Sequence, residues 1–233
     1  MRRLEFERDG RGVMLNVLSN PPSMKPLTCR ALLCVGVVAL AALTPSFAQT
    51  ATPPPVEVAG VKFNSVHAGS GAWYETEVEI QARPGAGADN KQFINRVKVT
   101  LNLGITSVKA PAGAKTPDTF YRASAEAVAI ETTGGKTVFR FYLPPEIVKR
   151  DQINGDQKFY LVELFVDGKA LPLTKYHFPV ASFTKLEFVE SFRSKVAGEA
   201  GANDGIMLPQ YLTPFAFSGS PPAPSFIRVE STR

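Results

Sequence analysis

Cysteine and histidine are scarce in this sequence, with two of each among its 233 residues. Both cysteines, Cys29 and Cys34, precede residue 49, so a chain processed there has no disulfide, no thiolate nucleophile and no cysteine metal site. The H-E-x-x-H, G-x-S-x-G, G-x-G-x-x-G and phosphate-loop motifs are absent as well. These absences remove the commonest signatures of hydrolases, metalloenzymes and nucleotide-binding proteins. We therefore expect no cofactor, no metal and no enzymatic activity.

The sequence has a single long apolar run, at residues 31–43. Its 13 residues are too few for a membrane span, which needs roughly 20, but they match the core of a signal peptide. Lys25 and Arg30 precede the run, and Ser46 and Ala48 supply the small residues of a cleavage site. The pattern predicts a signal peptide at 24–48, and we interpret residues 1–23 as an extension of the gene model.

This leader predicts an exported protein, in the periplasm, at the cell surface or outside the cell, with no membrane span after cleavage. A single anchoring helix and a lipid attached to Cys34 are the alternative interpretations. Six of the 26 Lys and Arg and three of the 21 Asp and Glu lie in residues 1–48, which leaves 20 basic and 18 acidic side chains. Because this balance is close to neutral, we expect no nucleic-acid partner.

Apolar and polar residues alternate with a period of two through most of the remaining chain, the pattern of half-buried antiparallel strands. We predict a Pro-rich tether at 49–55 and an immunoglobulin-like antiparallel β-sandwich at 56–183. Its strands are expected at 56–66, 73–82, 93–105, 120–131, 138–143, 159–166 and 176–183, with a short helix at 144–151. The acidic face of the second strand is expected to be solvated and to pair with the basic face of the third.

The pattern changes after residue 183, where the chain becomes helical and then apolar. Leu186, Val189, Phe192 and Val196 form one helical stripe, which predicts a helix at 182–197. Residues 205–217 are rich in apolar side chains and proline, and we expect 184–217 to dock on the domain's own sheets. Exchange of this segment between subunits is the alternative. Residues 218–233 are expected to be a disordered tail.

Several residues invite a chemical interpretation, and for each of them we favour a structural one. His177, Ser182 and Asp151 are the imaginable catalytic triad, but a strand histidine is more often a packing residue. The segment Gly69-Ser70-Gly71 lacks the lysine and helix of a phosphate loop and is interpreted as a turn. The remaining candidates are His67, Trp73 as a rim or interface aromatic, and calcium ligands among Glu75, Glu77 and Glu79 or Asp151 and Asp156. We assign no catalytic, cofactor-binding or metal-binding residue.

Five segments resemble a family of verrucomicrobial secreted pilus-like proteins with an immunoglobulin-like fold. They are WYETEVEI (73–80), NRVKVTLNL (95–103), FRFYLPPEIVKRD (139–151), FYLVELFVDG (159–168) and NDGIMLPQYLTPF (203–215). The resemblance implies an immunoglobulin-like fold and a place among pilus-like gene products. The leader, however, lacks the prepilin junction and the retained apolar helix of a type IV pilin, which favours an exported accessory or surface protein.

We therefore expect an exported, non-enzymatic protein that acts by protein–protein contact, in a pilus-like or envelope assembly. Its partner would be another protein or a second copy of the chain. Adjacent aromatic pairs in the strands place one ring on each sheet face, and we expect residues 182–217 to cover the outward rings. Exposed rings that mark a protein or glycan contact surface are the alternative. The alternatives are a glycan-binding module, a hydrolase accessory domain, and a hydrolase whose site is not recognised.

Overall fold

The computed structural model describes residues 53–69, 71–84, 92–106, 116–174 and 176–228. The predicted gene-model extension, the signal peptide and both cysteines lie outside the described residues, as do residues 49–52 of the tether. Within the tether, the Pro55 carbonyl accepts a hydrogen bond from the Arg83 N–H at 2.8 Å. This bond begins the backbone ladder of the first hairpin just before the expected first strand.

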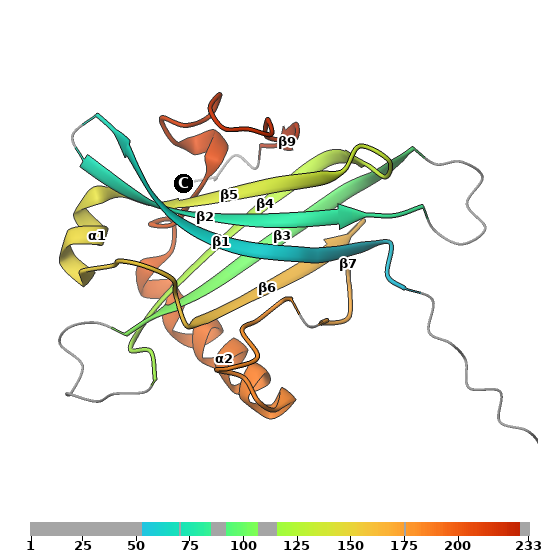
Figure 1. Cartoon of the computed structure of the whole chain (residues 1–233). Coiled ribbons are helices and arrows are strands. Elements are labelled where there is room, and N and C mark those ends of the chain that lie inside the picture. Colours follow the sequence, from blue (N-terminus) through green and yellow to red (C-terminus); the bar gives the residue numbers. More distant parts are fainter. Residues whose placement is uncertain (1–52, 70, 85–91, 107–115, 175, 229–233) are drawn as a thin grey trace, which may run out of the picture. The chain divides into compact units, whose positions relative to one another are not determined.

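The described residues form two antiparallel sheets and two α-helices (Figure 1). The strands are β1 (Val56–Ala68), β2 (Gly71–Ala82), β3 (Phe93–Ile105), β4 (Thr119–Glu131), β5 (Lys136–Leu143), β6 (Phe159–Val166), β7 (Lys169–Ala170), β8 (Leu208–Pro209) and β9 (Phe226–Ile227). The helices are α1 (Pro145–Asp151) and α2 (Leu186–Glu199), with 3₁₀ turns at Ala200–Asn203 and Gln210–Leu212. The six long predicted strands and the short helix at 144–151 are confirmed.

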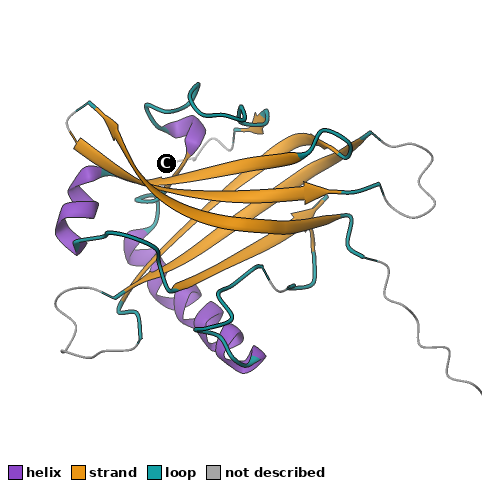
Figure 2. Cartoon of the chain, in the orientation of Figure 1, coloured by secondary structure: helices purple, strands orange, loops and turns teal. Residues whose placement is uncertain are grey.

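The strand order confirms the predicted sandwich. The first sheet has the order β1-β2-β5-β8 and the second the order β7-β6-β3-β4-β9. In chain order, β1, β2 and β5 take the places of immunoglobulin strands A, B and E, while β3, β4 and β6 take those of C, C′ and F. Figure 2 shows that strands are the main regular element of the described domain, with the helices outside the two sheets.

The core lies between the inner faces of the two sheets. Val78, Ile80 and Phe139 of the first sheet belong to the same buried cluster as Val99 and Leu101 of the second. The period-2 pattern sends alternate side chains of β3 into this layer from Val97 to Ile105, whereas Phe93 at the start of the strand is 49% exposed. With no cysteine among the described residues, this apolar layer holds the sheets together.

The second and third strands do not pair with each other, so the expected ion pairs between their faces are wrong. β2 lies between β1 and β5 in the first sheet, whereas β3 lies between β4 and β6 in the second. The acidic β2 side chains instead meet Lys62, Lys136 and Arg140 of their own sheet. Sequence periodicity assigns faces to a strand but does not choose its neighbours, which explains the error.

The predicted strand at 176–183 is also wrong, because its described residues form turns. Pro179 has no N–H to donate to a ladder, and its carbonyl accepts from the N–H groups of Ser182 and Phe183 at 3.0 and 3.1 Å. These bonds curl the chain toward α2. The helix then begins at Leu186, four residues after its expected start, and ends at Glu199.

Helix α2 covers the outer face of the second sheet. Val189, Phe192 and Val196 pack with Phe120 and Leu161 in a second buried cluster, which confirms three of the four predicted stripe residues. Leu186, the fourth, is the first residue of the helix and is 63% exposed. None of the helices in the described part of the chain has the length and apolarity to cross a bilayer.

The chain beyond α2 closes one side of the sandwich. Strand β8 pairs with the edge of β5, and β9 pairs with the edge of β4. Phe226 packs edge-on against Phe139 at 5.7 Å and also contacts Tyr211. The expectation of a disordered tail from residue 218 is therefore wrong for residues 218–228, because a backbone ladder and aromatic contacts fix them. Residues 229–233 lie outside the described range.

Gly104 of β3 tests the contact between α2 and the second sheet. A Cβ at this position would lie 2.9 Å from both the Phe192 ring and Pro117. We expect Gly104→Ala to lower the free energy of unfolding by about 1–3 kcal/mol through overpacking, as measured by urea titration. The control is Gly198→Ala on α2 itself, where an added Cβ meets nothing within 4 Å. This change should raise the free energy of unfolding by about 0.5–1 kcal/mol. Equal effects at both positions would contradict the observed packing of α2.

Candidate functional site

A hollow lined by aromatic rings lies where α2 meets the start of β6 and the turns before the helix. Its lining includes Phe159, Phe183, Phe188 and Phe192, with Ser191 and Lys195 at its rim, and its volume is about 260 Å³. We call this set of residues the aromatic hollow. It combines a concave apolar surface with a few polar groups, the general character of a binding site.

The helical repeat of α2 builds one wall of the aromatic hollow. Phe188, Ser191, Phe192 and Lys195 follow the spacing i, i+3, i+4, i+7, which puts them on one stripe of the helix. The buried rings of Phe183 and Phe192 form the floor, with centroids 5.2 Å apart and planes at 66°. Phe188 is 51% exposed, so the rim offers apolar area to a partner.

The electrostatics of the aromatic hollow are simple. Lys195 is the one charged residue among its lining, and within the described part of the chain no carboxylate lies in salt-bridge range of it. The Ser191 hydroxyl supplies a neutral donor and acceptor beside it. The site therefore suits an apolar group whose surroundings carry no positive charge.

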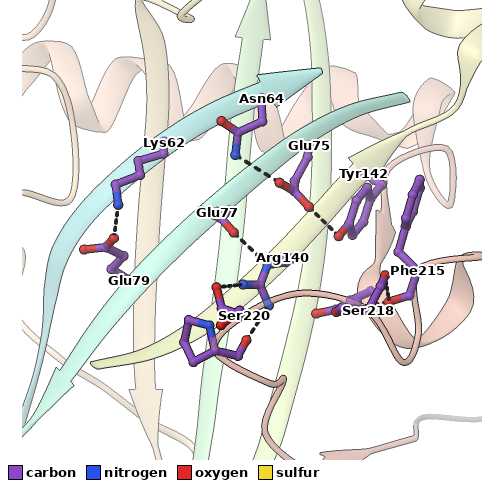
Figure 3. Close-up of polar contacts among 12 residues, drawn as sticks. Lys62, Asn64, Glu75, Glu77, Glu79, Arg140, Tyr142, Phe215, Ser218 and Ser220 are labelled. Atoms are coloured by element: carbon purple, nitrogen blue, oxygen red, sulfur yellow. Dashed lines mark hydrogen bonds and ion pairs between the residues drawn. The ribbon is translucent and has the colours of Figure 1, made fainter. Parts of the chain in front are cut away.

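The densest polar cluster lies elsewhere, on the outer face of the first sheet (Figure 3). Arg140 of β5, only 2% exposed, donates to Glu77 of β2 at 2.7 Å. The same guanidinium donates to the carbonyls of Pro221 and Ser220 at 3.1 and 3.3 Å. Three elements, two strands and the C-terminal loop, are thereby joined at one side chain.

Two more acidic residues of β2 extend this cluster. Glu75 accepts from the Tyr142 hydroxyl at 2.5 Å and from Asn64 Nδ2 at 3.0 Å. Burial, followed by the hydrogen bond to Glu75, raises the pKa of Tyr142. Glu79 bonds with Lys136 at 2.7 Å and also with Lys62, and these ammonium groups hold its pKa below the ordinary value of 4.5.

The expectation of a solvated acidic face on β2 is therefore wrong, since Glu75 and Glu79 are buried. Phe215 of the C-terminal loop stacks on Tyr142 with ring centroids 4.8 Å apart, and it also meets Trp73 edge-on at 5.8 Å. The loop thus covers a face that alternation alone assigns to water. Trp73 lies on this covered outer face, away from the core between the sheets.

His177 has a structural role at the edge of β6. Its carbonyl accepts from the Val162 N–H at 2.8 Å, and its Nδ1 lies 2.6 Å from the Val162 carbonyl oxygen. Because a carbonyl oxygen only accepts, Nδ1 must carry the proton. Burial lowers the pKa of His177 below its ordinary value of 6.5, which favours this neutral form. His177 thus satisfies both backbone groups of one edge residue, as a paired strand would.

The structure gives the three imagined triad residues different surroundings. Asp151 lies at the end of α1, where it accepts from the Tyr121 hydroxyl and from Arg150. Ser182 lines the aromatic hollow, while His177 is occupied by Val162. The histidine is therefore a packing residue, as we interpreted it.

The remaining candidate residues are the glycine turn, the possible calcium ligands and His67. Gly69 and Gly71 flank the turn of the β1–β2 hairpin, which confirms the interpretation as a turn; Ser70 between them lies outside the described residues. Asp156 is exposed, whereas Asp151 is buried. Among the described residues, no group of three or more His, Cys, Asp or Glu could hold a metal ion. His67 is exposed near the end of β1.

Sequence reasoning missed the aromatic hollow, although its signal is present. The helical stripe that was used runs through Val189, Phe192 and Val196 and marks the buried side of α2. A second stripe beside it, through Phe188, Ser191 and Lys195, has the same repeat but mixed polarity. Such a mixed stripe marks the border of a buried helix face, where a hollow forms if the neighbouring loop leaves space.

No protein-family model matches this sequence, and no curated protein matches it. Among solved structures, the chain is similar to a crystal structure from Akkermansia muciniphila. The two share 14% sequence identity with a TM-score of 0.48, and the match covers 78% of this chain and 99% of that one. The fold described above is established from the strand order of this chain alone.

Arg140 should be far more important for stability than an exposed arginine. Arg140→Met leaves Glu77 without its partner and frees the Ser220 and Pro221 carbonyls, so we expect the free energy of unfolding to fall by about 3 kcal/mol. The matched control is Arg83→Met just after β2, where the side chain is 49% exposed and pairs with Glu57. That change should cost under about 1 kcal/mol in the same urea titration. Equal losses for the two variants would contradict the buried ion pair.

His177 should make stability depend on pH. The pKa of His177 is lower in the folded than in the unfolded state, whose ordinary value is about 6.5. The contribution of neutral His177 to the free energy of unfolding is therefore complete above about pH 6.5 and is lost as the pH falls below it. Urea titrations at pH 7.5 and 5.5 should therefore show a fall in the free energy of unfolding. His177→Asn, whose amide also donates, should flatten that difference, whereas His67→Asn at the exposed histidine should retain it. If the His177→Asn variant loses as much stability between pH 7.5 and 5.5 as the unmodified protein, another group is responsible.

Proposed function

We propose that this protein is an exported, non-enzymatic immunoglobulin-like protein that acts by protein–protein contact in a pilus-like or envelope assembly. The observation that carries the proposal is the aromatic hollow with its half-exposed Phe188. Protein interfaces are enriched in aromatic residues, and their binding energy is concentrated where a side chain of one partner fills a pocket of the other. The resemblance of five segments to secreted pilus-like proteins supports the assembly.

The size of the aromatic hollow favours a side chain as its occupant. Sites for small molecules usually measure about 300–1,000 Å³, and the hollow at about 260 Å³ lies below that range. One aromatic or branched aliphatic side chain fits such a volume and would bury its apolar surface there. The rim would then contribute further apolar contact through Phe188.

The histidine chemistry of this chain gives no support to a hydrolase. His177 is buried with its Nδ1 proton committed to Val162, while Ser182 lies at the aromatic hollow. The glycan-binding alternative needs ring faces flanked by several hydrogen-bonding groups. Around the aromatic hollow the polar groups are mainly hydroxyls and one ammonium, a sparser set than a sugar with many hydroxyls requires.

The proposal is tested with cross-linked envelopes from cells that produce the protein. We expect the mature chain to begin at Gln49, to fractionate outside the cytoplasm and to enter cross-linked complexes. Phe188→Asp should reduce those complexes at least about tenfold, because a charge at the rim opposes burial of an apolar partner. Leu186→Asp is the matched control, since Leu186 is on the same helix and 63% exposed but does not line the aromatic hollow.

Two results would contradict the proposal. Unchanged complexes in the Phe188→Asp variant would show that the aromatic hollow is not the contact. Retention of the whole protein in the cytoplasm would overturn the export on which the assembly depends. Specific binding to a glycan array, lost in Phe188→Asp and kept in Leu186→Asp, would establish the glycan-binding alternative instead.

A further inference from the structure

Phe217 is the most exposed large apolar residue in the described part of the chain, with a relative exposure of 102%. It lies in the C-terminal loop that covers the first sheet. The surrounding residues 214–224 carry no charged side chain. The whole side chain of Phe217 is open to solvent, so its apolar area is available to a partner outside the domain.

The loop holds Phe217 in a fixed position. Phe215, two residues before it, stacks on Tyr142 at 4.8 Å. Gln210 is fully buried and donates through Nε2 to the carbonyls of Phe215 and Ser218, at 2.9 and 2.6 Å. The Ser218 N–H also donates to the Phe215 carbonyl at 3.0 Å. Since both neighbours are anchored, ordering Phe217 for binding costs little conformational entropy.

Phe217 and the aromatic hollow belong to opposite layers of the domain. The loop contacts the outer face of the first sheet through Tyr142 and Arg140. The hollow is built by α2, which packs on the outer face of the second sheet through Phe120 and Leu161. Figure 1 shows α2 and the C-terminal loop on opposite sides of the sandwich. A projecting ring and a hollow of side-chain size are thus found on two faces that cannot meet within one molecule.

We propose that Phe217 of one copy of this chain inserts into the aromatic hollow of the next copy. This inference rests on the proposed function and names its partner as a second copy. The contact joins two different surfaces, so it is head-to-tail, and repetition gives an open row of subunits unless the rotation closes a ring. The neutral loop brings no cation toward Lys195, whose ammonium can lie over the inserted ring or donate to a loop carbonyl.

The chemistry of both surfaces favours a second copy over another protein. The occupant of the aromatic hollow must be an apolar side chain with no positive charge around it, and the loop around Phe217 meets both conditions. It also presents the ring on an anchored backbone. Burial of a phenylalanine that is otherwise fully exposed gives the contact its driving force.

The test uses the full chain with Cys29→Ser and Cys34→Ser, so that introduced cysteines are the only thiols. One preparation carries Phe217→Cys and another Ser191→Cys, at the projecting ring and in the aromatic hollow. A short thiol-to-thiol cross-linker added to the mixture should give dimers containing one chain of each kind, and a chain carrying both substitutions should give a ladder. Ser194→Cys is the matched control, because Ser194 is exposed on the same helix but does not line the hollow.

Sedimentation of the unmodified chain over a range of concentrations supplies the second measurement. The average mass should rise with concentration, and Phe217→Ala and Ser191→Trp should each weaken association at least about tenfold. Phe217→Leu should retain most of it. A chain that remains monomeric, or cross-links equally well through Ser194→Cys, overturns the proposal. If self-association is absent but Phe188→Asp still removes the envelope complexes, another protein occupies the aromatic hollow and the proposed function survives. If self-association is absent and Phe188→Asp leaves the envelope complexes unchanged, the proposed function and this inference both fail.

Discussion

The guanidinium of Arg140 connects the parts of this domain that are far apart in the sequence. It lies between the outer face of the first sheet and the loop that covers it, with Glu77 on one side and the carbonyls of Ser220 and Pro221 on the other. A guanidinium removed from water needs an opposite charge and acceptors for its N–H groups. Arg140 finds the charge in Glu77 and further acceptors in the two carbonyls. The same contact sets where the loop crosses the sheet.

The position of the loop has two consequences. It lets Phe215 cover Tyr142 and Trp73, which removes a polar face from water and leaves Glu75 among hydrogen-bond partners. It also brings β9 to the edge of β4, where Phe226 reaches Phe139 in the core between the sheets. The loop is therefore part of the fold, and the exposure of Phe217 arises on an otherwise anchored segment.

Helix α2 covers the outer face of the second sheet, as the loop covers the outer face of the first. Its contact is apolar, through Phe192 against Phe120, and it depends on the absence of a side chain at Gly104. The turns before α2 end at Phe183, which becomes the floor of the aromatic hollow. The loop on the first sheet exposes Phe217, whereas α2 on the second sheet forms a wall of the aromatic hollow. The two outer faces therefore differ, which is a basis for head-to-tail contact.

The sequence by itself determined the six long strands and the inner faces of their central residues. Val99 and Leu101 alternate with polar residues, and their burial follows because successive side chains of a strand point to opposite faces. Likewise, the prolines at 144–145 begin a short helix, since the fixed φ of proline suits a first helical turn. These outcomes depend on neighbours only a few residues away.

Only the tertiary structure decided what covers the outer faces. Glu75 and Glu79 alternate like solvated residues, yet both are buried. Glu75 accepts from Tyr142, on which Phe215 of the distant loop stacks, and Glu79 pairs with Lys62 and Lys136 of the flanking strands. Arg140 reaches Pro221 across 81 positions of the chain, and His177, within the strand predicted at 176–183, bonds to one residue of β6 from a turn. The aromatic hollow likewise requires α2, β6 and the turns between them to meet. Periodicity records which side chains share a face, whereas the partner of that face depends on long-range contacts.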